Sequence, residues 1–273
     1  MKKFLKMCYM STLSLALLFS FFATPISAYS EEQTNAIFSE ETIEWLEKFN
    51  SLSLEEQLSV NHRPREVVEY LSSNKKSLDI LEDVVYIENI SYSSNYSHGT
   101  REIVPSDPGS GGMVTGGYEL AYNPSYWNGS RIKYANCYYY AMNVVSSSNN
   151  INHQQPGYLA GNIYASLTGY NIFLAAKRDV PYFSNVVSIR SSSQTEVPGV
   201  KEYKVALVIA PGFDYHWYRQ NPNGTWSHKR GQTAVTNVDA SGYIISNPQT
   251  CNRKYSSIVN YTTFAGFYIV KYA

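Results

Sequence analysis

The sequence has little cysteine and little charge, and it lacks any long apolar run beyond residue 28. Three cysteines occur in 273 residues, and charged residues make up 16%. A charged share well below the usual quarter, beside a normal apolar share of 44%, argues against wholesale disorder. The missing second apolar run excludes a multi-span membrane protein, and the missing period excludes collagen and coiled coil. The chain is long enough for one or two compact domains.

Tyrosine, in contrast, is abundant, at 25 of the 273 residues. Its ring has an apolar body and a polar tip, which suits β-rich surfaces and ligand clefts.

The first 28 residues have the pattern of a secretory signal. Lysines near the start precede an apolar stretch from Leu13 to Phe22, and Ala28 fits the last position before cleavage. We therefore expect a protein exported by a bacterium, extracellular or associated with the cell wall, with no stable membrane insertion after signal removal. Cys8 leaves with the signal, so Cys137 and Cys251 are the cysteines of the mature chain.

The zero net charge hides two opposed parts. Residues 29–90 hold 14 acidic and 5 basic residues, whereas residues 91–273 hold 8 acidic and 14 basic ones. We interpret 29–90 as an acidic helical N-terminal region, a candidate pro-region that docks on the basic part. The alternative is a solvated helical face beside scattered lysines. Ser, Gly and Pro over 91–117 indicate a linker, and 118–273 then forms the main domain.

Periodicity predicts helices before strands, and hence an α+β fold with an antiparallel sheet. Helix signals lie at 38–82, with starts near Ser39, Ser53 and Pro64. The other expected helices and strands are helices at 136–146 and 159–177, an early strand at 83–90, and strands at 203–210, 213–220, 225–229, 233–238, 243–246 and 264–271.

The first candidate for chemistry is Cys137, in the sequence Tyr134-Ala135-Asn136-Cys137. Asn136 is a good N-cap and places Cys137 in the first turn of a helix, where backbone N–H groups favour a reactive thiolate. The competing interpretation is a disulfide between Cys137 and Cys251, which an oxidising compartment favours.

The second candidate is a β-hairpin that carries two histidines. A three-residue loop of Pro222, Asn223 and Gly224 sets Tyr218 opposite His228 and places His216 and His228 on one face. A loop of two or four residues would place them on opposite faces.

A cysteine nucleophile needs an imidazole within hydrogen-bond reach, and the imidazole needs a polar neighbour that fixes its tautomer. These requirements suggest Cys137 as nucleophile, His216 as base and His228 as orienting residue. The other candidates for the orienting role are Asn237, Asp239 and Asp214. A helix packed with its Cys137 against the histidine face would complete the triad.

This order resembles the papain-like cysteine hydrolases of the NlpC-like superfamily, which include peptidoglycan peptidases and amidases. The resemblance covers roughly 120–273, and it rests on Asn136-Cys137, His216 and His228. The usual Asp-Cys-Ser-Gly is Asn-Cys-Tyr-Tyr here, and about 79 residues separate Cys137 from His216. The resemblance implies a papain-like α+β domain, with an antiparallel sheet packed on the cysteine-bearing helix. It also implies a divergent cysteine peptidase or amidase acting on peptide or peptidoglycan-type substrates without a cofactor.

Two other functions also agree with the sequence. One is a non-catalytic secreted binding module whose aromatic loops hold a polymer and whose two cysteines form a disulfide. The other is a secreted toxin or adhesin on the same scaffold. Zinc binding by Cys137, His216 and His228 ranks behind these because a fourth ligand at short spacing is missing. No basic-aromatic stripe argues for nucleic acid.

Overall fold

A computed structural model describes residues 37–73 and 112–273 of the chain. The predicted signal at 1–28, the predicted strand at 83–90 and most of the predicted linker lie outside these residues. The described residues form two compact units, 37–53 with 64–73 and 54–63 with 112–273. We call them the helical unit and the sheet unit. None of the described helices is long and apolar enough to cross a membrane.

The helices of the N-terminal region begin where the sequence predicts. Helix α3 (Glu40–Asn50) starts after Ser39, whose side chain accepts a hydrogen bond from the backbone N–H of Thr42. Helix α5 (Arg65–Ser73) follows Pro64, and both helices belong to the helical unit. Between them in sequence, the short helix α4 (Leu54–Ser59) and the residues to Arg63 belong to the sheet unit.

The sheet unit is built on a six-stranded antiparallel sheet with the order β1-β6-β2-β3-β4-β5. Its strands are β1 (Val186–Ser192), β2 (Glu202–Ala210), β3 (Asp214–Gln220), β4 (Trp226–Lys229), β5 (Val235–Thr236) and β6 (Thr263–Tyr272). Helices and an antiparallel sheet confirm the α+β class. The strongly buried strands β2 and β3 lie at the centre of this sheet.

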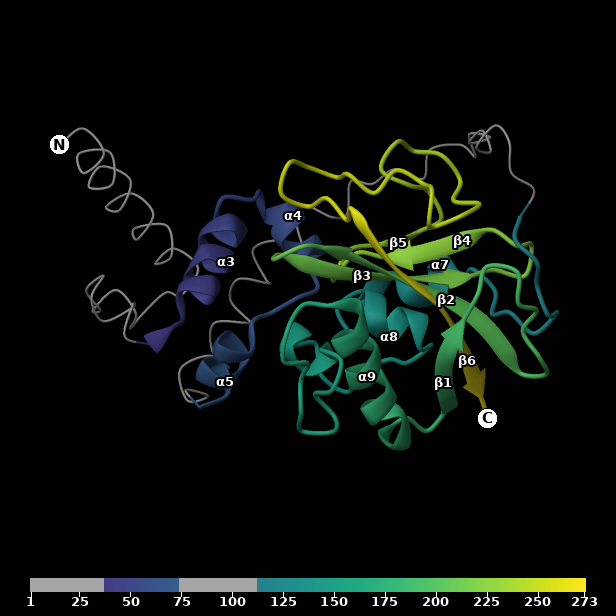
Figure 1. Ribbon diagram of the computed structural model, residues 1–273, viewed down its shortest axis with the longest axis horizontal. Helices are drawn as coiled ribbons and strands as arrows, with labels where there is room; N and C mark the ends of the chain where they lie inside the picture. The colour runs from purple at the N-terminus through teal and green to yellow at the C-terminus, as the bar shows by residue number, and fades with distance from the viewer. Residues whose placement is uncertain (1–36, 74–111) are drawn as a thin grey trace. The chain divides into compact units, whose positions relative to one another are not determined.

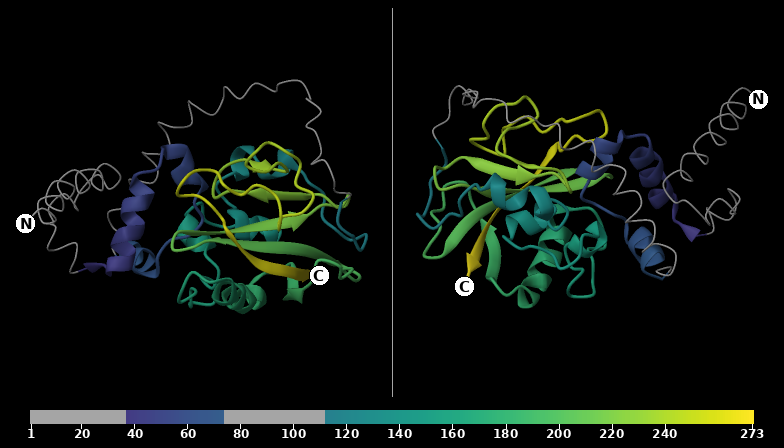
Figure 2. Two further views of the ribbon diagram at one scale, coloured as in Figure 1. Left: turned by 45° about the horizontal axis from the view of Figure 1, so that its top comes forward. Right: turned by 180° about the vertical axis from the view of Figure 1, so that it is seen from behind.

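Helices α8 (Cys137–Ala141) and α9 (Gly169–Asp179) pack against the sheet, α8 on β3 and β4 and α9 on β1, β2 and β6 (Figure 1). The loops that follow β5 lie on the other side of β3 (Figure 2), where Tyr261 faces the ring of His216. The remaining short helices are α7 (Pro124–Trp127), η3 (Gly129–Arg131), η4 (Ile151–Gln154) and η5 (Val180–Tyr182).

Several elements differ from the predicted ones for local reasons. Helix α8 ends at Ala141 because Asn143 adopts a left-handed conformation with φ of 56°. The N–H of Val144 then bonds to the carbonyl of Tyr139, which completes a helix-terminating motif. The helix predicted at 159–177 begins only at Gly169, after left-handed turns at Gly157 and Gly161.

The strand predictions hold best where turn chemistry fixes them. The strand predicted at 243–246 is reduced to a single bridge between Val238 and Ile244. Strand β1 was not predicted.

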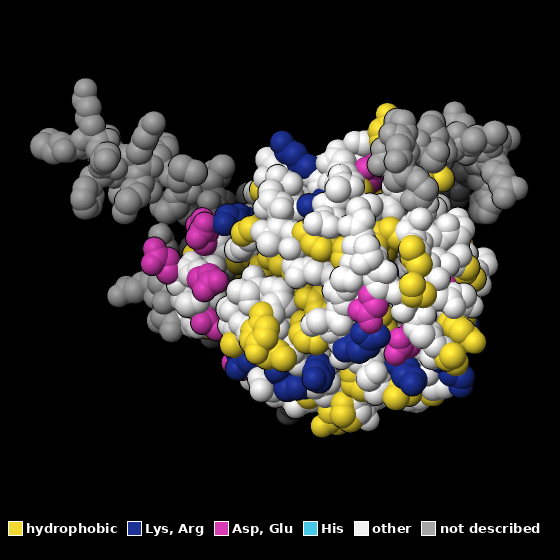
Figure 3. Space-filling model, turned by 45° about the vertical axis from the view of Figure 1, so that its right-hand side comes forward, with side chains coloured by type: hydrophobic (Ala, Val, Ile, Leu, Met, Phe, Trp, Pro, Cys, Tyr) yellow, Lys and Arg dark blue, Asp and Glu magenta, His cyan; other side chains and the backbone are white. Residues whose placement is uncertain are grey.

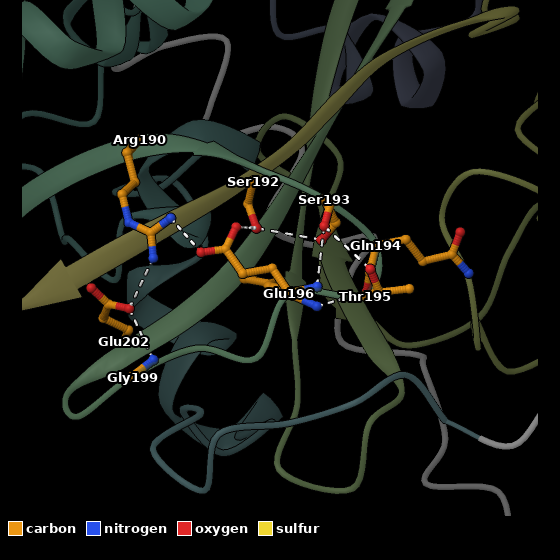
Figure 4. A network of polar contacts seen from close by, with 9 residues as sticks. Arg190, Ser192, Ser193, Gln194, Thr195, Glu196, Gly199 and Glu202 are labelled. Carbon is orange, nitrogen blue, oxygen red and sulfur yellow. Dashed lines mark hydrogen bonds and ion pairs between the residues drawn. The ribbon is translucent and has the colours of Figure 1, made fainter.

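The connection from β1 to β2 is held by Arg190, which forms ion pairs with Glu196 at 2.6 Å and Glu202 at 3.3 Å (Figure 4).

Candidate functional site

Cys137 lies at the start of α8, as predicted, and is fully buried. The side chain of Asn136 caps the helix by accepting from the N–H of Tyr139 at 3.1 Å. Burial raises the pKa of the Cys137 thiol well above its ordinary value, and the nearby Asp214 carboxylate raises it further. The backbone N–H groups of Trp217 and Tyr138 favour the thiolate and lower the pKa. The loss of hydration raises the pKa by more than these groups lower it. Burial of Cys137 therefore opposes the reactive thiolate that the sequence predicts.

The two histidines lie on one face of the hairpin, in the predicted register. Tyr218 pairs with His228, and the N–H of Asn221 bonds to Thr225 across the three-residue loop. The Nε2 of His216 lies 2.7 Å from the Nδ1 of His228, and the Nε2 of His228 lies 3.0 Å from the carbonyl of Val238.

The carbonyl oxygen of Val238 determines which ring nitrogens of the two histidines carry a proton. Because the carbonyl of Val238 can only accept, the Nε2 of His228 donates to it and the Nδ1 of His228 accepts from His216. Burial lowers the pKa of His228 to about 4 and that of His216 well below its usual range. Both rings are thus neutral, and the Nδ1 of His216 is an acceptor.

Cys137 does not meet this histidine pair directly. The side chains of α8 contact the face of β3 that carries Trp217 and Arg219, whereas His216 belongs to the alternate face. Within residues 37–73 and 112–273, no hydrogen bond joins the Cys137 thiol to a histidine. The carboxamide of Asn61 lies between them, with Oδ1 3.2 Å from the Cys137 backbone nitrogen and Nδ2 3.5 Å from the Nδ1 of His216.

Asn61 is the residue that sequence reasoning missed. Its Oδ1 accepts from the N–H groups of Cys137 and Gly231, the latter at 2.9 Å. Its Nδ2 donates to the Oδ2 of Asp214 at 3.2 Å and to the carbonyl of Tyr215 at 3.1 Å. Two donors and two acceptors are thereby used, which is the full capacity of a carboxamide. The only sequence signal was a short polar stretch between two helices.

Asp214 is the buried side chain that binds the backbone at Asn61 and His62. Its carboxylate accepts from the backbone N–H groups of Asn61 at 3.0 Å and His62 at 2.6 Å, and from the Tyr261 hydroxyl at 2.7 Å. Burial raises the pKa of Asp214 to about 6 against these hydrogen bonds, which lower it. The side chain of Gln155 adds a hydrogen bond to the carbonyl of Asn61 at 2.6 Å.

Two names are used for the parts of this site. Residues 54–63 are the Asn61 segment. The surface that binds the segment is called the acceptor, and it consists of Cys137, Gln155, Asp214, Tyr215 and Gly231.

The candidates for the orienting role differ in their hydrogen-bond partners. His228 is the one that bonds to His216. Asp239 instead accepts from the N–H groups of Ser241, Tyr243 and Asn252 and so holds its own loop. Asn237 accepts from the N–H of Ile245 through its backbone carbonyl.

Lys229 is a second buried group that the sequence did not single out. Its ammonium donates to the carbonyls of Ile132 and Gly231 on the face of the sheet that α8 covers. Burial lowers its pKa to about 7, and the proximity of Cys137 opposes this shift.

The described residues hold no group of three or more His, Cys, Asp or Glu that suits a metal ion, so Cys137, His216 and His228 do not form a zinc site there. Both cysteines are free thiols, so the Cys137–Cys251 disulfide is wrong. The observed contacts of Asn61 with Cys137, Asp214 and Gly231 hold a segment of the chain in this site.

Comparison with known proteins identifies one informative relative. Insoluble matrix shell protein 1 of Ruditapes philippinarum is 35% identical over 142 residues, which are 51% of this chain and 86% of that protein. The chain belongs to the family of this shell matrix protein. No family model matches the chain, and no solved structure matches it.

Membership in the shell matrix family overturns the function expected from the sequence. The relative is a matrix protein of a mollusc, so the expectation of a bacterial cell-wall cysteine peptidase is wrong. The sequence order of Cys137, His216 and His228 is typical of a hydrolase, but order alone does not report the protonation state or the access of the thiol. The non-catalytic alternative agrees better with this relative.

Proposed function

We propose that the protein is a secreted, non-catalytic component of an insoluble extracellular matrix. The observation that carries the proposal is the 35% identity to insoluble matrix shell protein 1 over 86% of that protein. The predicted signal at 1–28 supports secretion. The burial of the Cys137 thiol, which raises its pKa, supports the absence of thiol catalysis.

We propose that the sheet unit keeps a papain-like scaffold without the papain-like reaction. The order of a helix-start cysteine, a hairpin histidine and a second histidine supports this view, as does an antiparallel sheet against α8. The scaffold then serves for binding. Its partner is a matrix polymer rather than a peptidoglycan-type substrate.

Exposed tyrosines are the groups that we assign to polymer contact. Tyr170 at the start of α9 is 70% exposed, and Tyr182 in η5 is 61% exposed. Figure 3 shows hydrophobic side chains, the class that includes tyrosine, spread between Lys and Arg over one face of the molecule. Flat amphipathic rings contact polymers at low entropic cost, because they have few rotatable bonds.

Fractionation of the natural source tests the proposed function. We expect an antibody to detect the chain in the insoluble matrix after extraction with salt and mild detergent, and expect denaturant to release it. The Cys137→Ala variant should enter the matrix as the wild type does. Recovery of the protein only from the soluble fraction, with an amide-cleaving activity that Cys137→Ala abolishes, would contradict the proposal.

A further inference from the structure

The Asn61 segment occupies its site as a ligand does. It belongs to the sheet unit, yet the chain on both of its sides, up to Ser53 and from Pro64, belongs to the helical unit. Its contacts with the acceptor run through backbone groups and one carboxamide, and they join positions 76 to 170 residues apart. The segment and the acceptor are therefore separate surfaces that the chain merely tethers.

We propose that the Asn61 segment of one copy binds the acceptor of a second copy, and that this exchange links the chains of the matrix. This inference rests on the proposed function, because it names the partner through which the insoluble material is built. Each copy carries one segment and one acceptor. A head-to-tail contact of this kind leaves a free segment at one end and a free acceptor at the other, so it can extend without closing.

The contacts are the same whether segment and acceptor belong to one chain or to two. The difference between the two states is the tether, which gives the chain's own segment a high effective concentration. Exchange between copies is therefore favoured where the protein is concentrated, as in a deposited matrix. A sequence-predicted linker over 91–117 suits such an exchange because it lies between the segment and the acceptor residues along the chain.

Charge favours the approach of one copy to another. The segment lies within residues 29–90, which hold 14 acidic and 5 basic residues, whereas residues 91–273 hold 8 acidic and 14 basic ones. Oppositely charged parts of two copies attract each other at low ionic strength, and salt screens that attraction.

The acceptor selects a peptide that presents an asparagine at one position. A longer or shorter side chain than that of Asn61 would leave the N–H groups of Cys137 and Gly231 unpaired in a buried site. A methyl group on Gly231 would lie 2.1 Å from the carbonyl oxygen of Leu58, so a Cβ there excludes the segment. These two positions provide one variant for each side of the contact.

The first experiment measures binding of a labelled peptide of residues 54–63 to the full mature chain. The chain used is Asn61→Ala, whose own segment competes poorly. We expect the peptide to bind at least tenfold more tightly than the same peptide with Asn61→Ala. Without the Asn61 carboxamide, two buried N–H groups lose the oxygen that accepts their hydrogen bonds. We also expect Gly231→Ala in the chain to abolish the binding. Equal binding of the two peptides would overturn the proposal.

The second experiment measures molar mass by light scattering over a range of concentrations. We expect the wild type to form assemblies that grow with concentration, and Asn61→Ala and Gly231→Ala to remain monomers when alone. Mixed together, the two variants should form a 1:1 heterodimer, because one supplies an intact segment and the other an intact acceptor. Gly212→Ala is the matched control, since Gly212 is also left-handed but its Cβ would meet open space.

Failure of the inference and failure of the proposed function give different results. A chain found in the insoluble matrix whose two variants form no heterodimer overturns the exchange and leaves the proposed function standing. A heterodimer from the mixed variants, with the chain absent from the matrix, supports the exchange and overturns the proposed function. A wild type that is monomeric at every concentration also overturns the exchange.

Discussion

At the scale of single residues, the burial of Cys137 leads to a test of its predicted reactivity. We expect iodoacetamide near neutral pH to leave Cys137 of the native protein unmodified, because the thiol is buried and its pKa is raised. The partly exposed Cys251 should be alkylated slowly, since burial raises its pKa to about 12. Mass spectrometry of native and urea-unfolded samples checks this, and rapid native labelling of Cys137 would refute it.

Arg219 offers a second test at this scale. Its guanidinium lies over the ring of Tyr140 at 4.1 Å and donates to the carbonyls of Tyr140 and Ala121. A lysine lacks the planar group and carries its donors on a single nitrogen, so Arg219→Lys should cost about 2–4 kcal/mol in urea unfolding. Arg190→Lys is the control, because Arg190 forms exposed ion pairs worth at most about 1 kcal/mol. Similar costs for both variants would contradict the stacking argument.

At the scale of elements, the β3–β4 hairpin is held at its tip by the segment that precedes α7. The N–H of Met113 bonds to the carbonyl of Gly224, and Gln220 donates to the carbonyls of Met113 and Val114. Gly224 has a φ of 79°, and a Cβ there would lie 2.6 Å from the Met113 carbonyl oxygen. This close approach explains why glycine is required at the tip.

We therefore expect Gly224→Ala to destabilise the protein by about 2–4 kcal/mol, through backbone strain and the clash together. Gly242→Ala is the matched control, since Gly242 has a φ of 82° but its Cβ would meet nothing within 4 Å. It should show the backbone cost alone, about 1 kcal/mol. The midpoint of urea unfolding measures both, and equal losses would show that the clash has no effect.

The elements also show which parts of the fold the sequence can predict. The hairpin register followed from local turn chemistry at Pro222–Gly224, and the start of α8 followed from the Asn136 cap. Strand β1 escaped prediction because its burial alternates poorly along Val186–Ser192. Asn61 escaped because its partners are set by tertiary packing, 153 positions away at Asp214. The burial of Cys137 escaped because it depends on tertiary packing and not on the residues next to Cys137 in the sequence.

At the scale of the whole molecule, buried titratable groups set the pH dependence of stability. Asp214 has its pKa raised to about 6, so the folded state holds a proton that the unfolded state has lost, and stability falls as pH rises through this window. His228 has its pKa lowered to about 4, so its contribution rises with pH between 4 and 6.5. The two effects are similar in size, roughly 3 kcal/mol each, and opposite in sign.

Two further histidines decide the balance. Burial lowers the pKa of His62 to about 3 and that of His216 well below its usual value, and both must stay neutral in the folded state. We therefore expect Tm to fall as the pH is lowered from 6.5 to 4. Calorimetry at several pH values measures this, and His62→Gln should reduce the slope. A Tm that rises on acidification would contradict the assignment.

The docking of Asn61 on Asp214 also has a consequence for the order of folding. The contact closes a loop of 153 residues, whereas the His216–His228 pair closes one of 12. The entropic cost of closure grows with loop length, so the hairpin should form early and the Asn61 segment should dock last. A refolding chain then passes through a period in which its sheet is complete and its acceptor is still open. Pulsed alkylation during refolding should find Cys137 reactive in that interval and protected afterwards.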